Sequence, residues 1–284
     1  MHFKSEETVS NCIFCDRPAG LFHNKHHDCA EKHESGRRQI ANLISQAPSS
    51  SVSAGTIASQ IRKVAEESFI SEPESKDLLM AAWSSAVDDS LHNGILSEKT
   101  EKQLLDLKNS LSLTLGDLLQ TDAWDRIVKS AVLRDVMSGV IPNRMQFDGR
   151  LPLNFQKGEQ VVWVFDQVDY LEEKTRREHV GGSRGVSVRV MKGVYYHIGG
   201  FKGRTIERTE MVHADTGVVA VTTKQIYFSG ARKGFRIPYN KIVSFEPYTD
   251  GLGVMRDALS AKPQIFVTHD GWFTYNLVTN LARL

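Results

Sequence analysis

Three cysteines and three histidines lie within the eighteen residues CIFCDRPAGLFHNKHHDC, from Cys12 to Cys29, and these are all the cysteines of the chain. Cys12 and Cys15 have the two-residue spacing that lets both sulfurs of a tight turn face one cation, and His26 and Cys29 form a second such pair. Thiolate and imidazole ligands satisfy tetrahedral Zn²⁺ and leave no position for water. We therefore predict a structural zinc site formed by Cys12, Cys15, His26 and Cys29.

The surrounding residues favour a metal knuckle. Pro18 and Gly20 favour a turn that brings the two pairs together, and the residues after Cys29 begin like a helix, which is typical of a treble-clef or zinc-ribbon arrangement. His33 would share a helix face with Cys29 and is a rival to His26 as the fourth ligand. Unliganded cysteines or a redox-active pair are the alternatives. A segment this short has little apolar surface, so we expect metal binding and folding to be coupled.

A helical region is expected to follow this knuckle, which with its helix occupies 1–46. The small and polar residues of 47–55 are typical of a flexible linker, and apolar residues spaced by three and four predict a small helical bundle over 56–141. The segment DDSLHNGILSEKTE does not fit a calcium loop, because Leu91 and Thr100 would stand where carboxylates are needed. It resembles the helix connections of TerB-like domains in tellurite-resistance and stress proteins, which implies a role in bacterial stress response. We carry no metal ligands over from this resemblance.

The pattern changes after a connector at 142–157. Short β-rich runs separated by glycine or aspartate turns fill most of 158–284, and the final residues GWFTYNLVTNLARL predict a helix with a wide apolar face. Bent sheets can bury their inner faces while a helix covers the open end. The predicted fold class is therefore α+β and multidomain, with an N-terminal zinc knuckle, a small helical bundle and a C-terminal β unit capped by a helix.

The segment GVVAVTTKQIYFSGARKGFRIPYNKIVSFEPYTDGLGV resembles bacterial pleckstrin-homology-like (PH-like) and GRAM-like families. The matching positions lie in two strands and their turns, and the likeness extends over about 158–284; the positions are Thr222, Ile226, Phe228, Ile237, Tyr239 and Ile242. The resemblance implies a β-sandwich or barrel with a C-terminal helix. It identifies a fold, and a fold alone does not define a function.

The stretch 174–208 is the most polarised part of the chain, with nine basic and two acidic residues. Lys174, Arg176, Arg177 and Arg184 lie beside glycines and form a possible anion-binding loop, which the resemblance associates with anionic lipid head groups. A protein partner and single-stranded nucleic acid are alternatives. So is the solvated face of a half-buried strand, with paired glycines forming hairpin turns.

Composition and motifs limit the functional class. The chain has 284 residues, of which 40% are hydrophobic and 24% charged, as in ordinary globular proteins. The N-terminus lacks the apolar core of a secretory signal, and no apolar run is long enough to span a bilayer. We therefore expect a cytoplasmic protein, with a peripheral position at the inner membrane surface as the alternative. No HExxH motif occurs in the sequence, which favours a non-enzymatic protein.

These observations lead to two functional hypotheses. The first is a zinc-binding adaptor of bacterial type whose PH-like unit binds a protein partner, a second copy of itself or an anionic membrane surface. The second is a nucleic-acid-binding protein that uses the knuckle and the basic stretch 174–208.

Overall fold

The computed structural model describes residues 10–20, 22–91, 94–145, 153–191 and 194–284, and the side chains of 176–208 are outside this description. Parts of the predicted knuckle (1–9), of the TerB-like segment (92–93) and of the connector (146–152) therefore lie outside the described residues. The chain divides into two compact units, Met1–Ser138 and Gly139–Leu284. Each unit is described by itself.

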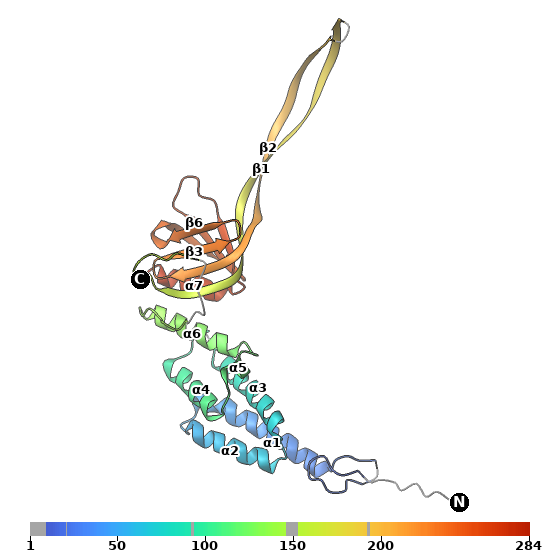
Figure 1. Cartoon of the computed structure of the whole chain (residues 1–284), viewed down its shortest axis with the longest axis vertical. Helices are drawn as coiled ribbons and strands as arrows, with labels where there is room; N and C mark the ends of the chain where they lie inside the picture. The colour runs from blue at the N-terminus through green and yellow to red at the C-terminus, as the bar shows by residue number, and fades with distance from the viewer. Residues whose placement is uncertain (1–9, 21, 92–93, 146–152, 192–193) are drawn as a thin grey trace, which may run out of the picture. The chain divides into compact units, whose positions relative to one another are not determined.

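The first unit places a Cys/His segment before a group of helices (Figure 1). The helices are α1 (His27–Gln46), the short 3-10 helix η1 (Ala47–Ser49), α2 (Ala54–Glu67), α3 (Glu72–Ser90), α4 (Glu98–Ser110), α5 (Leu115–Leu118) and α6 (Ala123–Met137). The segment 47–55, which its composition suggests is a linker, thus contains η1 and the first two residues of α2, and Ala47 in it is buried.

Local sequence signals explain where these helices begin. Ser53 and Ser97 accept hydrogen bonds from the backbone N–H groups of Thr56 and Thr100 and so cap α2 and α4. Thr114 and Asp117 form a reciprocal capping box at α5. The caps satisfy backbone donors that the first helical turn leaves without partners.

The helices share one apolar core. Trp83 of α3 is fully buried, and its indole N–H donates a hydrogen bond to the carbonyl of Leu104 in α4, 3.1 Å away. α4 and α6 are also joined by an ion pair of 2.6 Å between largely buried Glu101 and Arg134. The core therefore combines apolar packing with polar contacts that fix the relative register of the helices.

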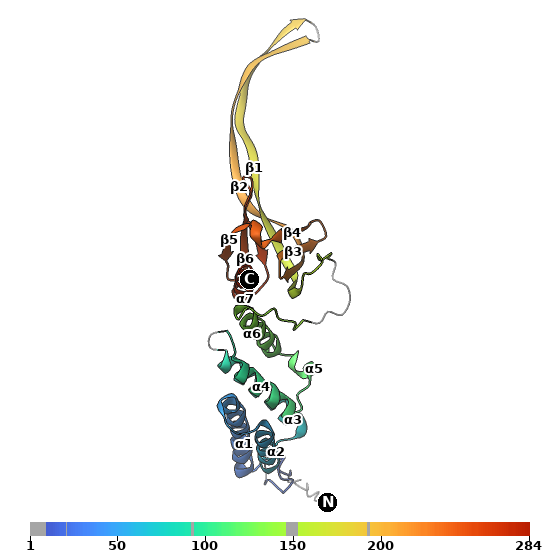
Figure 2. The same ribbon diagram turned by 90° about the vertical axis from the view of Figure 1, so that its left-hand side faces the viewer.

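The second unit is an antiparallel sheet followed by a helix. Its strands are β1 (Val161–Met191), β2 (Val194–Thr222), β3 (Gln225–Gly230), β4 (Gly234–Pro238), β5 (Ile242–Pro247), β6 (Gly251–Arg256) and β7 (Gln264–Val267), with the 3-10 helix η2 (Tyr239–Lys241) after β4. The strand order is β4-β3-β2-β1-β7-β6-β5. Figure 2 shows the curled sheet, with β3 and β4 on one side of β1 and β2, and β5 and β6 on the other.

The curled sheet encloses an aromatic core, and α7 (Gly271–Leu281) packs at one end of it. Phe273 of α7 lies 4.8 Å from Trp163 and 5.9 Å from Phe165 between ring centroids. Gly271 lets the start of α7 lie against the turn between β5 and β6, because a Cβ there would lie 1.9 Å from the carbonyl oxygen of Tyr248. The helix is thus part of the core of the second unit.

The residues that carry the PH-like resemblance are core and turn positions in the structure. Ile226, Phe228 and Ile237 are buried. The Thr222 hydroxyl accepts a hydrogen bond from the backbone N–H of Gln225, and Tyr239 donates one to the Thr222 carbonyl, at 3.1 and 2.7 Å. These contacts fix the turn between β2 and β3 and the end of β4.

β1 and β2 are much longer than the other strands and continue beyond the sheet as a two-stranded ribbon (Figures 1 and 2). We call Lys174–Met191 of β1 and Val194–Glu210 of β2 the arm. Gly181 and Gly182 lie within β1, where they pair with Gly203 and Lys202. The prediction that these paired glycines form a hairpin turn is therefore wrong.

The expected α+β class is confirmed: a Cys/His cluster, a helical region and a curled antiparallel sheet followed by a helix that contacts it. Among the helices of the described residues, none is both long and apolar enough to cross a bilayer.

Candidate metal centre

A tight loop positions the first cysteine pair. Asn11 and Pro18 form an isolated antiparallel bridge, and the backbone N–H of Cys12 donates a hydrogen bond of 2.7 Å to the Arg17 carbonyl. Asp16 closes the loop with a φ of 55°, a left-handed conformation that Asp adopts more readily than most residues. The loop therefore folds back directly after Cys15.

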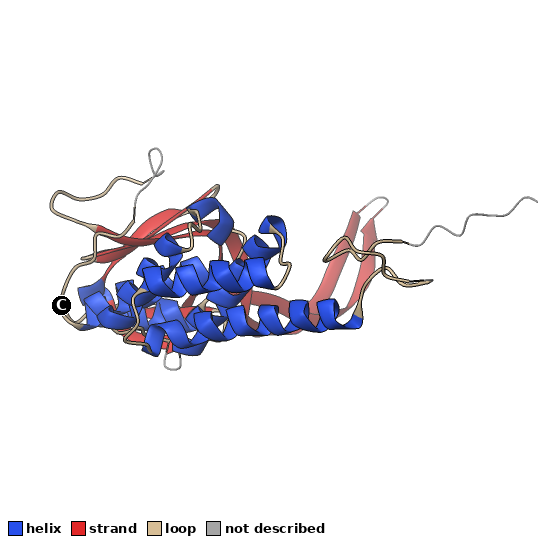
Figure 3. Ribbon diagram, turned by 90° about the horizontal axis from the view of Figure 1, so that it is seen from below, coloured by secondary structure: helices blue, strands red, loops and turns tan. Residues whose placement is uncertain are grey.

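The second pair lies where the loop meets α1, as the tan and blue ribbons of Figure 3 show. His26 immediately precedes the helix and Cys29 is in its first turn. The Nδ1 atom of His26 lies 3.3 Å from the sulfur of Cys15 and 3.7 Å from that of Cys29. The backbone N–H of His26 points to the sulfur of Cys12 at 3.4 Å. One ligand atom from each of the four residues lies within 4.8 Å of the others.

The second ring nitrogen of His26 defines its orientation. Nε2 lies 3.0 Å from the carbonyl oxygen of Pro18. A carbonyl can only accept, so Nε2 carries the hydrogen, and in the neutral ring Nδ1 then presents its lone pair to the sulfurs. Metal-binding histidines are commonly held in this way, with the other ring N–H bound to a carbonyl.

The four donors fit a tetrahedral zinc ion. With Zn–S bonds of about 2.3 Å and a Zn–N bond of about 2.0 Å, a tetrahedral site requires separations of about 3.5 Å between sulfur and nitrogen. The observed distances of 3.3 and 3.7 Å bracket this value. The arrangement brings together all four predicted ligands and could hold a metal ion such as zinc.

Cys12 and Cys29 differ in how readily their thiols ionise when no cation is bound. Burial raises the pKa of the Cys12 thiol, but backbone N–H groups of His26, Phe14 and Cys15 that face its sulfur outweigh burial and lower the pKa to about 6. Burial and then the neighbouring sulfurs of Cys15 and Cys12 raise the pKa of Cys29 to about 11. A divalent cation attracts all three sulfurs, and its binding at neutral pH would release the Cys29 proton.

His33, the rival ligand, lies elsewhere. Its Nε2 atom is 3.0 Å from a carboxylate oxygen of Glu74 in α3, and the other oxygen of Glu74 accepts a hydrogen bond from Arg37 at 3.0 Å. Phe14, between the two knuckle cysteines, stacks on the His33 ring with centroids 4.7 Å apart. His33 therefore joins the knuckle to the helices rather than belonging to the cluster of four ligands.

Two apolar residues of the knuckle are exposed, and nothing in the sequence predicted that these side chains would face solvent. The side chains of Ile13 and Phe22 are 66% and 98% exposed. The backbone N–H of Ile13 donates a hydrogen bond of 2.9 Å to the Asn24 carbonyl, which joins the two loops that carry these residues. An unpaired Ile or Phe is common in surface loops, so only the fold distinguishes them from core residues.

The candidate anion-binding residues lie in β1. Lys174 is half-exposed and lies 4.0 Å from Glu172, while the side chains of Arg176, Arg177 and Arg184 are outside the described part of the chain. Their backbones pair with Arg208, Glu207 and Gly200 of β2. These four residues thus occupy strand positions in the arm rather than a compact loop.

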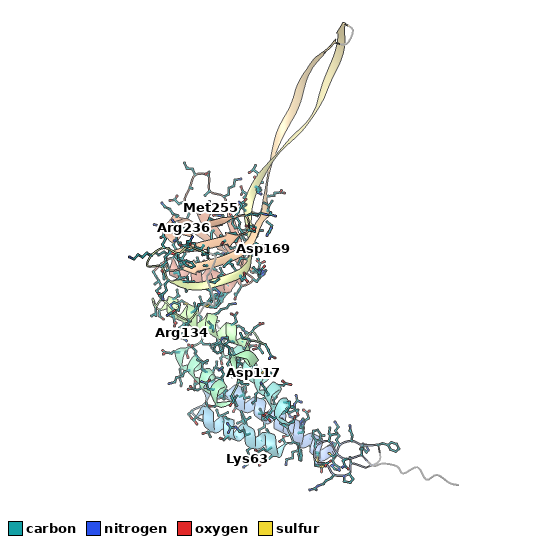
Figure 4. The ribbon with its side chains drawn as sticks, viewed as in Figure 1. Lys63, Asp117, Arg134, Asp169, Arg236 and Met255 are labelled. Carbon is teal, nitrogen blue, oxygen red and sulfur yellow. The ribbon has the colours of Figure 1, made fainter. Side chains whose placement is uncertain are left out.

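A second polar cluster joins β1 and β2 where the arm leaves the sheet, near the labelled Asp169 (Figure 4). Thr216 donates a hydrogen bond of 2.6 Å to Asp169, and Nε2 of His213 lies 2.9 Å from Thr216 and 3.2 Å from Asp169. The hydrogen bond from Thr216 is the main cause of the lowered pKa of Asp169. Because both contacts use the same histidine nitrogen, this is not the relay of a catalytic triad.

Comparisons of the chain with protein-family models, with curated proteins and with solved structures each found no match. The chemistry of the chain's own residues is therefore the basis on which its function is inferred.

Proposed function

We propose that this chain is a non-enzymatic adaptor whose N-terminal knuckle binds a structural zinc ion and presents a surface to a protein partner. The observation that carries the proposal is the cluster of Cys12, Cys15, His26 and Cys29, which supplies four donors to one ion. Four protein ligands leave no coordination position for water or substrate, and this is the hallmark of a structural rather than a catalytic site.

The packing of the knuckle supports a structural role for the ion. Phe14 contacts His33 and also lies 6.3 Å from Phe69, between ring centroids, at the end of α2. Among the described residues of 10–26, Cys12 is the one buried hydrophobic residue, so little apolar packing holds these loops. Zinc would supply the cross-link that these loops need, because a small segment without a core folds only with its metal.

We infer further that the second unit is a PH-like module. A curled antiparallel sheet followed by a helix is the arrangement that the resemblance implies, and the residues that carry the resemblance fill its core and turns. The adaptor would act in the cytoplasm, and the TerB-like likeness suggests a place in bacterial stress response.

The protein partner would bind the exposed apolar side chains of the knuckle. Ile13 and Phe22 stand on loops that the zinc ion and the hydrogen bond from Ile13 to Asn24 would hold rigid. Apolar side chains on a rigid support bind a partner with little loss of conformational entropy.

Partner capture from the native cell tests this function. We expect full-length protein to retain a partner that the double variant Ile13→Ser and Phe22→Ser loses, as measured by quantitative mass spectrometry. The matched control changes Val243 and Leu259, two exposed apolar residues of the second unit, to serine. A set of bound proteins that is identical for all three forms would refute a partner site on the knuckle.

Cobalt substitution tests the closed character of the site. Co²⁺ bound by three thiolates and one imidazole in tetrahedral geometry should give intense visible absorption that added azide or cyanate does not change. A spectrum that shifts with these anions would reveal an open coordination position and contradict a purely structural ion.

A further inference from the structure

The arm is a two-stranded ribbon that leaves its sheet. β1 pairs with β7 only from Asp169 to Glu172, and β2 pairs with β3 only from Gly217 to Val221. Beyond these residues β1 and β2 pair with each other, from Lys174 opposite Glu210 to Met191 opposite Val194. At about 3.3 Å per residue the arm is about 60 Å long. A two-stranded ribbon is marginally stable in water, so a partner that binds along it would stabilise it.

The charge of the arm runs along its length. Between residues 174 and 208 the structure describes the backbone of eight basic residues and two acidic residues. The basic residues are Lys174, Arg176, Arg177, Arg184, Arg189, Lys202, Arg204 and Arg208. Only Lys174 and Arg177 lie opposite an acidic residue in the strand register, Glu210 and Glu207 respectively. The other six recur from the root of the arm towards its tip without an acidic residue opposite them.

Acidic side chains at the root of the arm are already paired. Glu172 forms an ion pair of 2.6 Å with Lys233, and Glu173 lies 3.6 Å from Lys262. Lys262 also donates a hydrogen bond of 3.0 Å to the hydroxyl of Thr175. These carboxylates are thus neutralised by lysines of the β3–β4 and β6–β7 connections, and the net field along the arm is positive.

Two cross-strand pairs in the middle of the arm consist of glycines only. Gly181 lies opposite Gly203, and Gly185 lies opposite Gly199. Two glycines in one cross-strand pair leave no side chain at that level, which allows close approach of another molecule and eases bending of the ribbon.

These features favour a long, regular polyanion over the other candidate partners. A second copy of the arm would carry the same charge and would be repelled. A membrane surface would favour charge gathered at the tip, whereas here it is spread over about 60 Å. A nucleic-acid duplex carries one negative charge per about 1.7 Å of axis, and its major groove, about 12 Å wide, admits a two-stranded β-ribbon. We propose that the arm is a binding site for double-stranded nucleic acid, lying along the groove and pairing with its phosphates.

This proposal goes beyond the adaptor function and does not depend on the zinc ion. The test measures binding of the full-length protein to a fluorescent 30-base-pair DNA duplex by anisotropy, from 50 to 300 mM NaCl. The arm variant changes Arg184, Arg189 and Lys202 to glutamine. The charge-matched control changes Lys63, Lys99 and Lys102, three exposed lysines of the helical unit, to glutamine. Thermal melting of all forms checks that they are folded.

We expect the arm variant to bind the duplex at least about tenfold more weakly at 100 mM NaCl, and its slope of log K against log salt to be smaller by about 2.7. The control should keep the affinity of the unmodified protein within about twofold. Absence of duplex binding at 50 mM NaCl, or equal losses in the arm variant and the control, would overturn the proposal.

Two further probes separate the alternatives. Vesicles of phosphatidylcholine with 30% phosphatidylserine test a membrane, and a 30-nucleotide single strand tests nucleic acid without a groove. Vesicle binding that depends on the arm and exceeds duplex binding would overturn the proposal in favour of a membrane. Equal arm-dependent binding of single strand and duplex would overturn recognition of the groove.

Discussion

At the scale of single residues, the two ring nitrogens of His26 have different partners: one contacts the backbone and the other faces the cysteine sulfurs. Its Nε2 atom is bound by the Pro18 carbonyl and its Nδ1 atom faces the sulfurs of Cys15 and Cys29. The sequence identifies His26 from its spacing to Cys29, but it leaves His33 as a rival, because a helix places residues 29 and 33 on one face. In the structure His33 instead contacts Glu74, 41 residues away, and this long-range contact has no local signal.

The two histidines should respond differently to substitution. We expect His33→Ala to keep one zinc per chain and to lower the free energy of unfolding by about 1 to 3 kcal/mol, because it removes a largely buried hydrogen bond and the contact with Phe14. His26→Ala should lose most of the metal. Elemental analysis and urea unfolding of both variants check this, and metal loss in His33→Ala alone would contradict the assignment.

Gly36 is a second residue whose role depends on a distant contact. A Cβ at this position in α1 would lie 2.2 Å from the Ser68 hydroxyl oxygen, at the end of α2. We therefore expect Gly36→Ala to destabilise the helical unit by about 1 to 3 kcal/mol, although alanine is the better helix former. Gly55→Ala in α2 is the matched control, because no atom lies within 4 Å of its added Cβ.

Thermal unfolding of these two glycine variants measures the predicted difference in stability. Gly55→Ala should be neutral or stabilising by up to about 1 kcal/mol. If Gly36→Ala melts at or above the temperature of the unmodified protein, then α1 and α2 do not pack as closely as described.

At the scale of elements, signals that are local in sequence give reliable predictions. The Cys-x-x-Cys pair and the apolar face of the last helix each act within a few residues, and each has its place in the structure. The arm depends instead on pairing between strands. Its glycines read as turns in the sequence, yet Gly181 and Gly185 lie opposite other glycines inside two long strands.

The contact of α7 with the sheet predicts the effect of two neighbouring aromatic substitutions. Phe273 is buried against Trp163 and Phe165, whereas Trp272 is half-exposed. Phe273→Ala should lower the free energy of unfolding of the second unit by about 3 to 5 kcal/mol, and Trp272→Ala by less than about 0.5 kcal/mol. Amide hydrogen exchange in β6 and β7 measures this, and equal effects of the two changes would contradict the packing of α7.

The capping box of α5 predicts a dependence on acid. Asp117, which is labelled in Figure 4, lies 2.8 Å from Lys76 and accepts two hydrogen bonds from Thr114. The hydrogen bond from Lys76, followed by those from Thr114, lowers the pKa of Asp117 to about 2. Its unfolded pKa is about 3.9, so its stabilising effect is complete above about pH 4 and is lost as the pH falls to about 2.

Asp117→Asn isolates this effect from other acid-sensitive groups. At pH 7 the variant should melt at a lower temperature than the unmodified protein, and the difference should shrink as the pH falls from about 4 to about 2. A constant difference across this range, measured by calorimetry, would show that the carboxylate charge does not contribute.

At the scale of the whole molecule, the chain combines two compact units with different charge. The unit Met1–Ser138 has 15 basic and 20 acidic residues, and the unit Gly139–Leu284 has 20 and 14. The predicted zinc ion belongs to the first unit, so its removal by a chelator should expose 10–30 to proteases and leave the melting of the second unit unchanged.

The metal content of untagged, freshly purified protein tests the central claim most directly. Elemental analysis should find one zinc ion per chain, and Cys15→Ser should retain less than about a tenth of it, because the remaining ligands cannot complete a tetrahedral site. Less than about a tenth of an equivalent of zinc, iron or a comparable metal in the unmodified protein would contradict the account.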